Sequence, residues 1–115
     1  MSRIKSGKVT RKRHKRLLKK TKGFWGQRKN VFRRAKETLL RAMAYAFKSR
    51  KLRKRDMRSL FIARTKAASV QNGISYSKFM FGLKEAKIEL NRKMLSQLAI
   101  FEPDAFAQLV QIAKG

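Results

Sequence analysis

The distribution of charge constrains this chain more than any other feature of its sequence. The 115 residues include 32 Lys or Arg but only 6 Asp or Glu. Residues 1–60 hold 24 of the basic residues and two acidic ones, whereas residues 61–115 hold eight and four. Because so dense a positive charge cannot be neutralised within the chain, the first half needs a polyanionic partner before it can be compact. The sequence therefore predicts a basic arm that binds nucleic acid, joined to a small domain of ordinary composition.

The composition excludes several other classes of protein. The chain has no cysteine, which rules out a disulfide framework and a thiolate metal site. Residues 1–22 contain eleven Lys or Arg and no apolar stretch that could form the core of a signal peptide. No run approaches the roughly 18 apolar residues of a membrane span. We therefore expect an intracellular protein with no cleaved leader, no membrane partner and no cofactor.

In the first part of the arm, charge dominates over hydrophobic pattern. Residues 1–9 show no period and predict an irregular tail. Thr10 can cap a helix over residues 11–22. The only apolar residues of that helix, Leu17 and Leu18, are adjacent and make no core-facing stripe. Like charges four residues apart oppose the helix in isolation, so we expect it to form on binding.

Two aromatic residues between glycines interrupt the arm at residues 23–26, Gly-Phe-Trp-Gly. Gly23 is placed to end the preceding helix as its C′ residue. Phe24 and Trp25 have two readings: they pack on neighbouring helices, or they stack against unpaired bases, each of which offers an aromatic face. The lysines and arginines on both sides favour contact with nucleic acid.

An unbroken helix is predicted from Gln27 to about Arg58, because this stretch contains no Pro or Gly. Apolar residues recur at helical spacing through its first half and form a stripe wide enough to pack on a neighbour. The stripe consists of Val31, Phe32, Ala35, Leu39, Leu40, Ala42, Met43, Ala46 and Phe47. Residues 48–55 place charge all round the helix, which fits a helix enclosed by phosphates better than the usual alternative, a charged face in contact with water. Helical spacing then continues to Val70 and stops at an Asn-Gly pair.

The second half predicts three short helices. Ser75 and Asn91 can cap the first two, and Pro103 stands at the first helical position of the third. The first helix carries Phe79, Met80 and Leu83, and the third carries Phe106, Leu109, Val110 and Ile112. The second has Met94, Leu95, Leu98 and Ala99 as its predicted buried side. We therefore predict an all-α fold, with a long basic helical extension over residues 1–58 and a small globular helical bundle over residues 59–115.

The sequence offers no set of residues for catalysis. His14 is the only histidine, and the cations around it make it a better candidate for a phosphate or base contact than for a catalyst. Glu85 and Glu89 stand four residues apart with no further carboxylates or histidines to complete a metal site. We therefore predict a protein that is not an enzyme and has no metal and no small-molecule substrate.

Five segments carry a resemblance to a known family. They are residues 11–16 (RKRHKR), 22–26 (KGFWG), 54–60 (KRDMRSL), 72–79 (NGISYSKF) and 91–95 (NRKML). In this order, and spanning nearly the whole chain, they resemble the bacterial-type ribosomal protein L20 family of the large ribosomal subunit. The resemblance implies a basic helical extension threaded into large-subunit (23S-type) rRNA, a small helical domain at its surface, and an early role in assembly of the subunit.

The resemblance also implies partners and a location. The partners are large-subunit rRNA and neighbouring large-subunit ribosomal proteins, such as members of the L21 family. The location is the cytoplasm, in the ribosome, with an organellar ribosome as an alternative. Some members of the family repress translation of their own message, which stays open as an additional role. We expect no independent homo-oligomer.

The expected mechanism is the displacement of counterions from RNA by ammonium and guanidinium groups, which lets the arm bridge RNA helices that repel one another. Specific placement must then come from shape, the aromatic pair and the globular domain. The predicted rRNA-contact residues are Arg3, Lys5, Lys8, Arg11, Lys12, Arg13, His14, Lys15, Arg16, Lys19, Lys20, Lys22, Phe24, Trp25, Arg28, Lys29, Arg33, Arg34, Arg41, Lys48, Arg50, Lys51, Arg53, Lys54, Arg55, Arg58 and Arg64.

Two other classes of protein stay open at this point. A nucleoid-like DNA-binding protein would also be strongly basic, although the sequence shows neither a recognition helix with short polar readers nor a sustained heptad seam. A membrane-active cationic helix needs a broad apolar face, which residues 1–22 and 48–58 lack.

Overall fold

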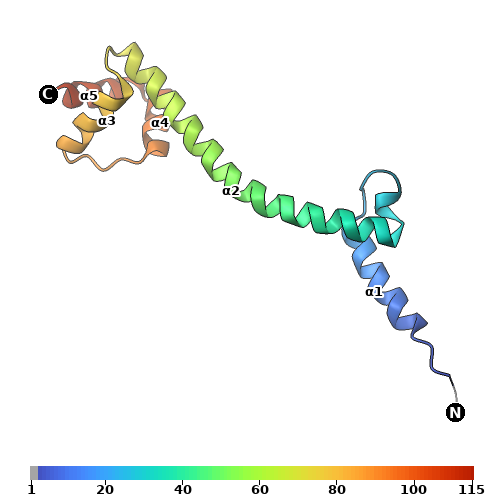
Figure 1. The fold of residues 1–115 in the computed structure, drawn as a ribbon. Helices are drawn as coiled ribbons and strands as arrows, with labels where there is room; N and C mark the ends of the chain where they lie inside the picture. The colour runs from blue at the N-terminus through green and yellow to red at the C-terminus, as the bar shows by residue number, and fades with distance from the viewer. Residues whose placement is uncertain (1–2) are drawn as a thin grey trace. The chain divides into compact units, whose positions relative to one another are not determined.

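The computed structural model describes residues 3–115 (Figure 1). Within this range the chain forms five α-helices and one short 3-10 helix and no β-strand, which confirms the predicted all-α fold. The chain divides into two compact units, Met1–Lys51, here the N-terminal unit, and Leu52–Gly115, the C-terminal unit. None of the described helices combines the length and the apolar composition that a membrane span requires. The functional division at residue 58 stays a prediction.

The first helix, α1 (Gly7–Lys20), begins one turn earlier than the sequence predicted. Residues 3–6 have no regular structure, and residues 1 and 2 of the predicted tail lie outside the described part of the chain. Thr10 is not the cap: its backbone N–H donates to the carbonyl oxygen of Ser6 at 3.0 Å, so Ser6 is the N-cap residue.

The prediction that the long helix starts at Gln27 is wrong. The segment Gly26–Lys29 is a 3-10 helix, and the long helix α2 runs from Phe32 to Gln71. Two glycines with positive φ, Gly23 at 90° and Gly26 at 59°, turn the chain between α1 and α2. Gly23 lies two residues beyond the C-cap Thr21 of α1, not one as predicted. The turn residues therefore separate two helices and do not belong to the second.

The N-terminal unit buries little apolar surface. Thr21 and Ala35 are fully buried, and Leu17, Leu18 and Leu39 are half-buried. The hydroxyl of Thr21 donates to the carbonyl oxygen of Leu18 at 3.2 Å, which satisfies this polar group inside the turn. The sequence predicted no packing face for the first helix, and the structure shows a limited one that is made at its C-terminal end.

The apolar stripe predicted on α2 is covered only at its start. Ala35 is buried, whereas Leu40, Met43 and Phe47 are all more than half exposed. The ammonium group of Lys51 lies 4.5 Å from the centroid of the Phe47 ring, in a cation–π contact. The predicted packing of the whole stripe is therefore not found within the N-terminal unit.

The C-terminal unit contains the end of α2 and three short helices, α3 (Tyr76–Glu85), α4 (Arg92–Phe101) and α5 (Pro103–Lys114). The predicted caps are confirmed. The side chain of Ser75 accepts the backbone N–H of Lys78 at 3.4 Å, and that of Asn91 accepts the N–H of Met94 at 2.9 Å. Pro103 occupies the start of α5, where its missing N–H costs no helical hydrogen bond.

A single core fills the C-terminal unit. The buried apolar residues are Ile74, Phe79, Leu83, Leu95, Phe106 and Val110. The rings of Phe79 and Phe106 lie 5.1 Å apart at 40°, so that α3 and α5 meet through aromatic contact. The predicted burial of Met94 is wrong, since this residue is 38% exposed; Ile112 is 51% exposed. Met80, Leu98, Ala99 and Leu109 are half-buried against this core.

Gly82 allows α3 and α5 to approach each other closely. A Cβ atom built at this position would overlap the carbonyl oxygen of Ala113 and would lie 2.7 Å from its Cα atom. The obstacle is backbone and cannot rotate away as a flexible side chain would. The absence of a side chain at position 82 is therefore a condition for the contact between these two helices.

Candidate nucleic-acid interface

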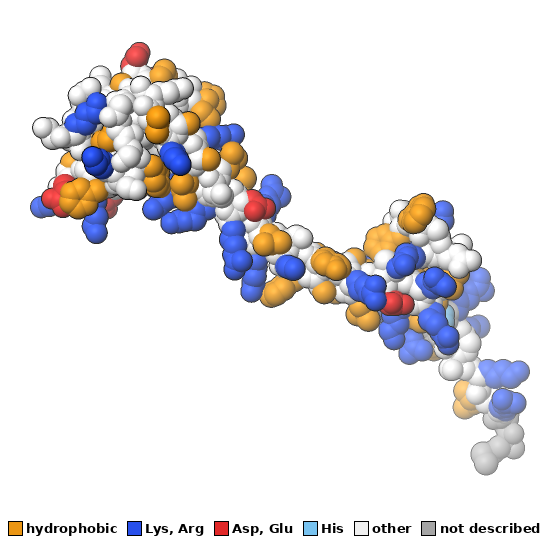
Figure 2. Space-filling view, turned by 45° about the horizontal axis from the view of Figure 1, so that its top comes forward, with side chains coloured by type: hydrophobic (Ala, Val, Ile, Leu, Met, Phe, Trp, Pro, Cys, Tyr) orange, Lys and Arg blue, Asp and Glu red, His pale blue; other side chains and the backbone are white. Residues whose placement is uncertain are grey.

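The predicted contact residues form an exposed basic surface. All of the predicted lysines and arginines are exposed, and only His14 and Phe24 of the predicted set are half-buried. The N-terminal unit carries 20 Lys or Arg and a single acidic residue, Glu37. Figure 2 shows the basic side chains gathered around the helices of this unit. Such a surface attracts polyanions because nothing inside the unit neutralises it.

Few of these cations are engaged by the chain itself. Between residues 3 and 115 the structure contains one ion pair, Arg41 with Glu37 at 3.3 Å, and both side chains are more than 60% exposed. A pair of this kind contributes little stability in water. The guanidinium group of Arg28 donates to the hydroxyl of Thr38 at 2.9 Å, and that hydroxyl donates to the carbonyl oxygen of Arg34 at 2.8 Å. Arg28 and Arg41 are thus held in place by neighbours on α2.

The helix α1 presents a continuous row of cations along one side. Six of them line a shallow groove of about 600 Å³: Lys8, Arg11, Lys12, Lys15, Arg16 and Lys19. Their spacing of three and four residues places them on one helical face. Without a counter-charge these groups repel one another, and phosphate oxygens are the natural ligands for them. The geometry suits a nucleic-acid backbone that lies along the helix.

The structure divides the two readings of the aromatic pair between its members. Phe24 is half-buried and packs within the turn, whereas Trp25 is 91% exposed. A large aromatic ring in water, with basic residues on both sides in the sequence, is suited to stacking on a base. Packing in the turn therefore suits Phe24 and base stacking suits Trp25, and both residues stay predicted rRNA contacts.

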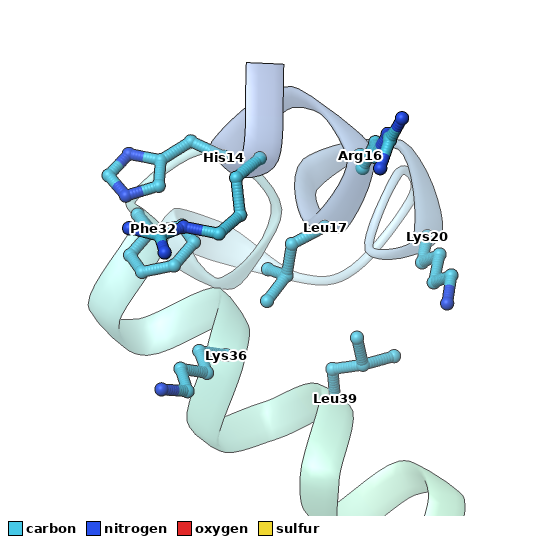
Figure 3. A pocket seen from close by; sticks show the side chains of 8 residues that line it. His14, Arg16, Leu17, Lys20, Phe32, Lys36 and Leu39 are labelled. Carbon is cyan, nitrogen blue, oxygen red and sulfur yellow. The ribbon is translucent and has the colours of Figure 1, made fainter. Parts of the chain in front are cut away.

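His14 lies in an aromatic contact that the sequence did not reveal. Its ring stacks on that of Phe32, with the centroids 3.7 Å apart and the planes at 17°. Beside this pair lies a groove of about 490 Å³ (Figure 3). Its lining comes from α1 and the start of α2: Arg13, His14, Arg16, Leu17, Lys20, Phe32, Lys36 and Leu39. Four of these residues, Leu17, Phe32, Lys36 and Leu39, were missing from the predicted contact set.

A sequence signal for the missed residues exists on α2. Phe32, Lys36 and Leu39 stand four and three residues apart, which places them on one face of a helix. Which partner that face meets depends on the turn after α1, and the turn was not predicted correctly. Helical periodicity alone therefore could not predict the groove.

Two cations of the C-terminal unit have structural partners. The guanidinium group of Arg92 donates to the phenolic oxygen of Tyr76 at 3.2 Å. The ammonium group of Lys114 donates to the backbone carbonyl oxygen of Asn72 at 2.9 Å, across the ends of two helices. Neither residue was in the predicted contact set. By contrast, Arg58 and Arg64 belong to the predicted contact set, and both are exposed on α2.

The described residues offer no arrangement for metal binding. Over residues 3–115 no group of three or more His, Cys, Asp or Glu side chains comes together in a way that could hold a metal ion. What the surface provides is a high density of hydrogen-bond donors with positive charge, together with exposed aromatic rings. These groups bind phosphates and bases.

Comparison with known proteins gives a consistent result. A sequence model of the family described as ribosomal protein L20 matches residues 3–109. A protein from Caldanaerobacter subterraneus subsp. tengcongensis, named large ribosomal subunit protein bL20, is 56% identical over 114 residues, which cover 99% of this chain and 96% of the relative. Proteins of the same name from Thermoanaerobacter sp. and Clostridium novyi are each 54% identical with the same coverage.

Proposed function

The chain belongs to the ribosomal protein L20 family and is thus a constituent of the large ribosomal subunit, and we propose that its N-terminal unit binds the rRNA of that subunit directly. We infer from this membership that the chain is a structural component of the ribosome, in the cytoplasm, and that it is not an enzyme. Neighbouring ribosomal proteins are its other proposed partners.

One observation supports direct rRNA binding above all others: the predicted cations are exposed and almost entirely free of internal counter-charge. The N-terminal unit has 20 Lys or Arg against one carboxylate, and that carboxylate pairs with Arg41 alone. When such cations meet RNA, condensed counterions are released, and this release is the main sequence-independent driving force of binding. Arginines add a planar fork that grips phosphate through two hydrogen bonds.

The same imbalance supports a role in assembly of the subunit. RNA helices repel one another because each carries a phosphate backbone, and a basic segment placed between two of them lowers that repulsion. The free N-terminal unit repels itself in the same way, since like charges stand four residues apart along α1. Ordering of this unit and approach of the RNA helices are therefore coupled, and the chain promotes early compaction of the rRNA.

The affinity for homologous large-subunit rRNA tests the proposal. It would be measured for the full chain at fixed physiological salt, with excess transfer RNA and duplex DNA as competitors. We expect a preference of about 10³-fold or more for the rRNA, by analogy with specific protein–DNA sites. Displacement by the competitors nearly one for one would contradict specific rRNA binding. Displacement by duplex DNA alone would favour a nucleoid-like role.

A further inference from the structure

The groove between α1 and the start of α2 has no assigned role, and we infer that it receives a single unpaired nucleotide of the large-subunit rRNA. This inference rests on the proposed function and names the part of the RNA that the groove takes. Its basis is the combination of flat apolar walls with a rim of cations, both within the N-terminal unit.

The walls of the groove suit the face of a base. The His14 ring is held flat against the Phe32 ring at 3.7 Å and 17°. Leu17 of α1 and Leu39 of α2 point toward one another beside this pair (Figure 3). The groove that these residues help to line measures about 490 Å³. Aromatic and aliphatic side chains on facing walls are the groups on which proteins stack splayed-out bases.

The rim of the groove suits the phosphates of the same nucleotide. Arg13, Arg16 and Lys20 approach from α1 and Lys36 from α2, and all four are exposed. No carboxylate lines this groove. Within this groove, a phosphate of the inserted nucleotide would therefore meet only positive groups. Charge complementarity thus selects an anionic ligand, and the apolar walls select one with a flat, weakly hydrated face.

A second hollow extends the site along α2. It has a volume of about 600 Å³ and shares His14, Phe32 and Lys36 with the first groove. It adds Arg33 and Leu40, together with Glu37, whose carboxylate already pairs with Arg41. The stacked rings thus line both hollows. An RNA strand whose base enters the first groove has a cationic path for the neighbouring nucleotide in the second.

Duplex RNA would use this surface poorly. Its bases are stacked and paired, so a duplex can offer only its phosphates and sugars to the groove. The cations would be satisfied, but the walls formed by Leu17, Phe32 and Leu39 would stay exposed to water. An unpaired nucleotide covers these walls and also satisfies the cations, and for this reason the groove favours a bulge or loop.

Filling the groove without changing its charge tests the inference. Leu39→Trp places a large side chain in the groove, and Met43→Trp, one turn further along α2 at an exposed position outside the lining, is the matched control. We expect Leu39→Trp to weaken rRNA affinity about 5- to 140-fold, the equivalent of roughly 1–3 kcal/mol for one stacked base. The salt dependence should not change, and Met43→Trp should bind within about twofold of the wild type. Wild-type affinity of Leu39→Trp would overturn the inference.

A footprint on the rRNA decides the matter even if Leu39→Trp disturbs the packing of α1 on α2. In the wild-type complex we expect one unpaired base to be shielded from base-specific methylation. That protection should persist in Trp25→Ala, because Trp25 lies outside the groove lining. A footprint of backbone protections on paired segments only, or one in which no base protection survives in Trp25→Ala, would overturn the inference. If the rRNA still outcompetes transfer RNA and DNA in that case, the proposed function stands and only the assignment of the groove fails.

Discussion

The two units of this chain reach an ordered structure by opposite means. The C-terminal unit buries Ile74, Phe79, Leu83, Leu95, Phe106 and Val110, whereas Ala35 is the only buried apolar residue of the described N-terminal unit. The N-terminal unit instead carries an excess of 19 positive charges, against seven for the C-terminal unit. Apolar burial stabilises the C-terminal unit without a partner, whereas the N-terminal unit needs a polyanion to offset its charge. The apolar core therefore lies in one half of this short chain and most of the excess charge, with the proposed RNA-binding surface, in the other.

The helix ends repeat this contrast on a smaller scale. The helices α3 and α4 each begin with a side chain that accepts a backbone N–H, from Ser75 and from Asn91. The N-cap residue of α1, Ser6, makes no side-chain cap hydrogen bond. The local signals that stabilise an isolated helix are present in the C-terminal unit and missing from the start of the N-terminal one.

The largest expected difference between the two units is in their response to salt. If the N-terminal unit engages six to ten phosphates, a rise from 50 to 200 mM salt should lower rRNA affinity by about 10³- to 10⁵-fold. The aromatic NMR signals of Phe79 and Phe106 should stay in place, because the core that holds them contains no charge. Filter binding and NMR over one salt series would test both statements. An affinity that hardly depends on salt would remove the basis of the comparison.

The next largest effect should come from the core. Phe79 is fully buried, so Phe79→Ala should lower the free energy of unfolding by about 3–5 kcal/mol. Phe81, two residues further along the same helix and 64% exposed, is the control, and Phe81→Ala should change it by less than about 0.5 kcal/mol. Denaturant titration of the full chain measures both. In Phe79→Ala the slope of RNA affinity against salt should be retained, and its loss would show that the units are not independent.

A smaller effect is expected at the turn between α1 and α2. Trp25→Ala should weaken rRNA affinity by about 1–3 kcal/mol if the ring stacks on a base, while circular dichroism stays unchanged because the side chain is exposed. Phe24→Ala should instead lower the helical signal, since Phe24 is half-buried in the turn. Equal affinity of Trp25→Ala and the wild type would show that the exposed ring has no base partner.

The smallest difference should appear at the caps. Asn91→Ala removes the hydrogen bond to the backbone N–H of Met94 and should cost about 1 kcal/mol of stability. Ser6→Ala is the matched substitution in the other unit and should be nearly neutral, because the Ser6 side chain makes no cap hydrogen bond. Thermal unfolding of the two variants compares them directly. A larger loss in Ser6→Ala than in Asn91→Ala would reverse the contrast drawn above.

Local signals explain which parts of the fold could be predicted from the sequence. The caps at Ser75 and Asn91 and the proline at position 103 act within three or four residues, so their positions were predicted correctly. The start of α2 was missed because Gly26 adopts a positive φ in a 3-10 turn, which no nearby residue pattern demands. Met94 has helical spacing typical of a core residue but lies at the edge of its helix.

The candidate site shows the same limit. The exposure of its cations could be predicted because so many like charges cannot be buried together. The groove could not be predicted, because Leu17 and Leu39 come from two different helices. The pattern of one helix does not show which residues of the other it meets. His14 was predicted as a contact residue, but its stacking on Phe32 depends on how the intervening turn folds. Sequence patterns thus predicted the chemical character of the surface but not its shape.

The close approach of α3 and α5 at Gly82 has a consequence for the evolution of the family. Every amino acid other than glycine has a Cβ atom, and at this position any Cβ would meet the backbone of Ala113. No other amino acid therefore fits at position 82 while α3 and α5 keep their present positions. A substitution at position 82 therefore requires a simultaneous shift of α5. Related chains that keep this helix pair should keep the glycine.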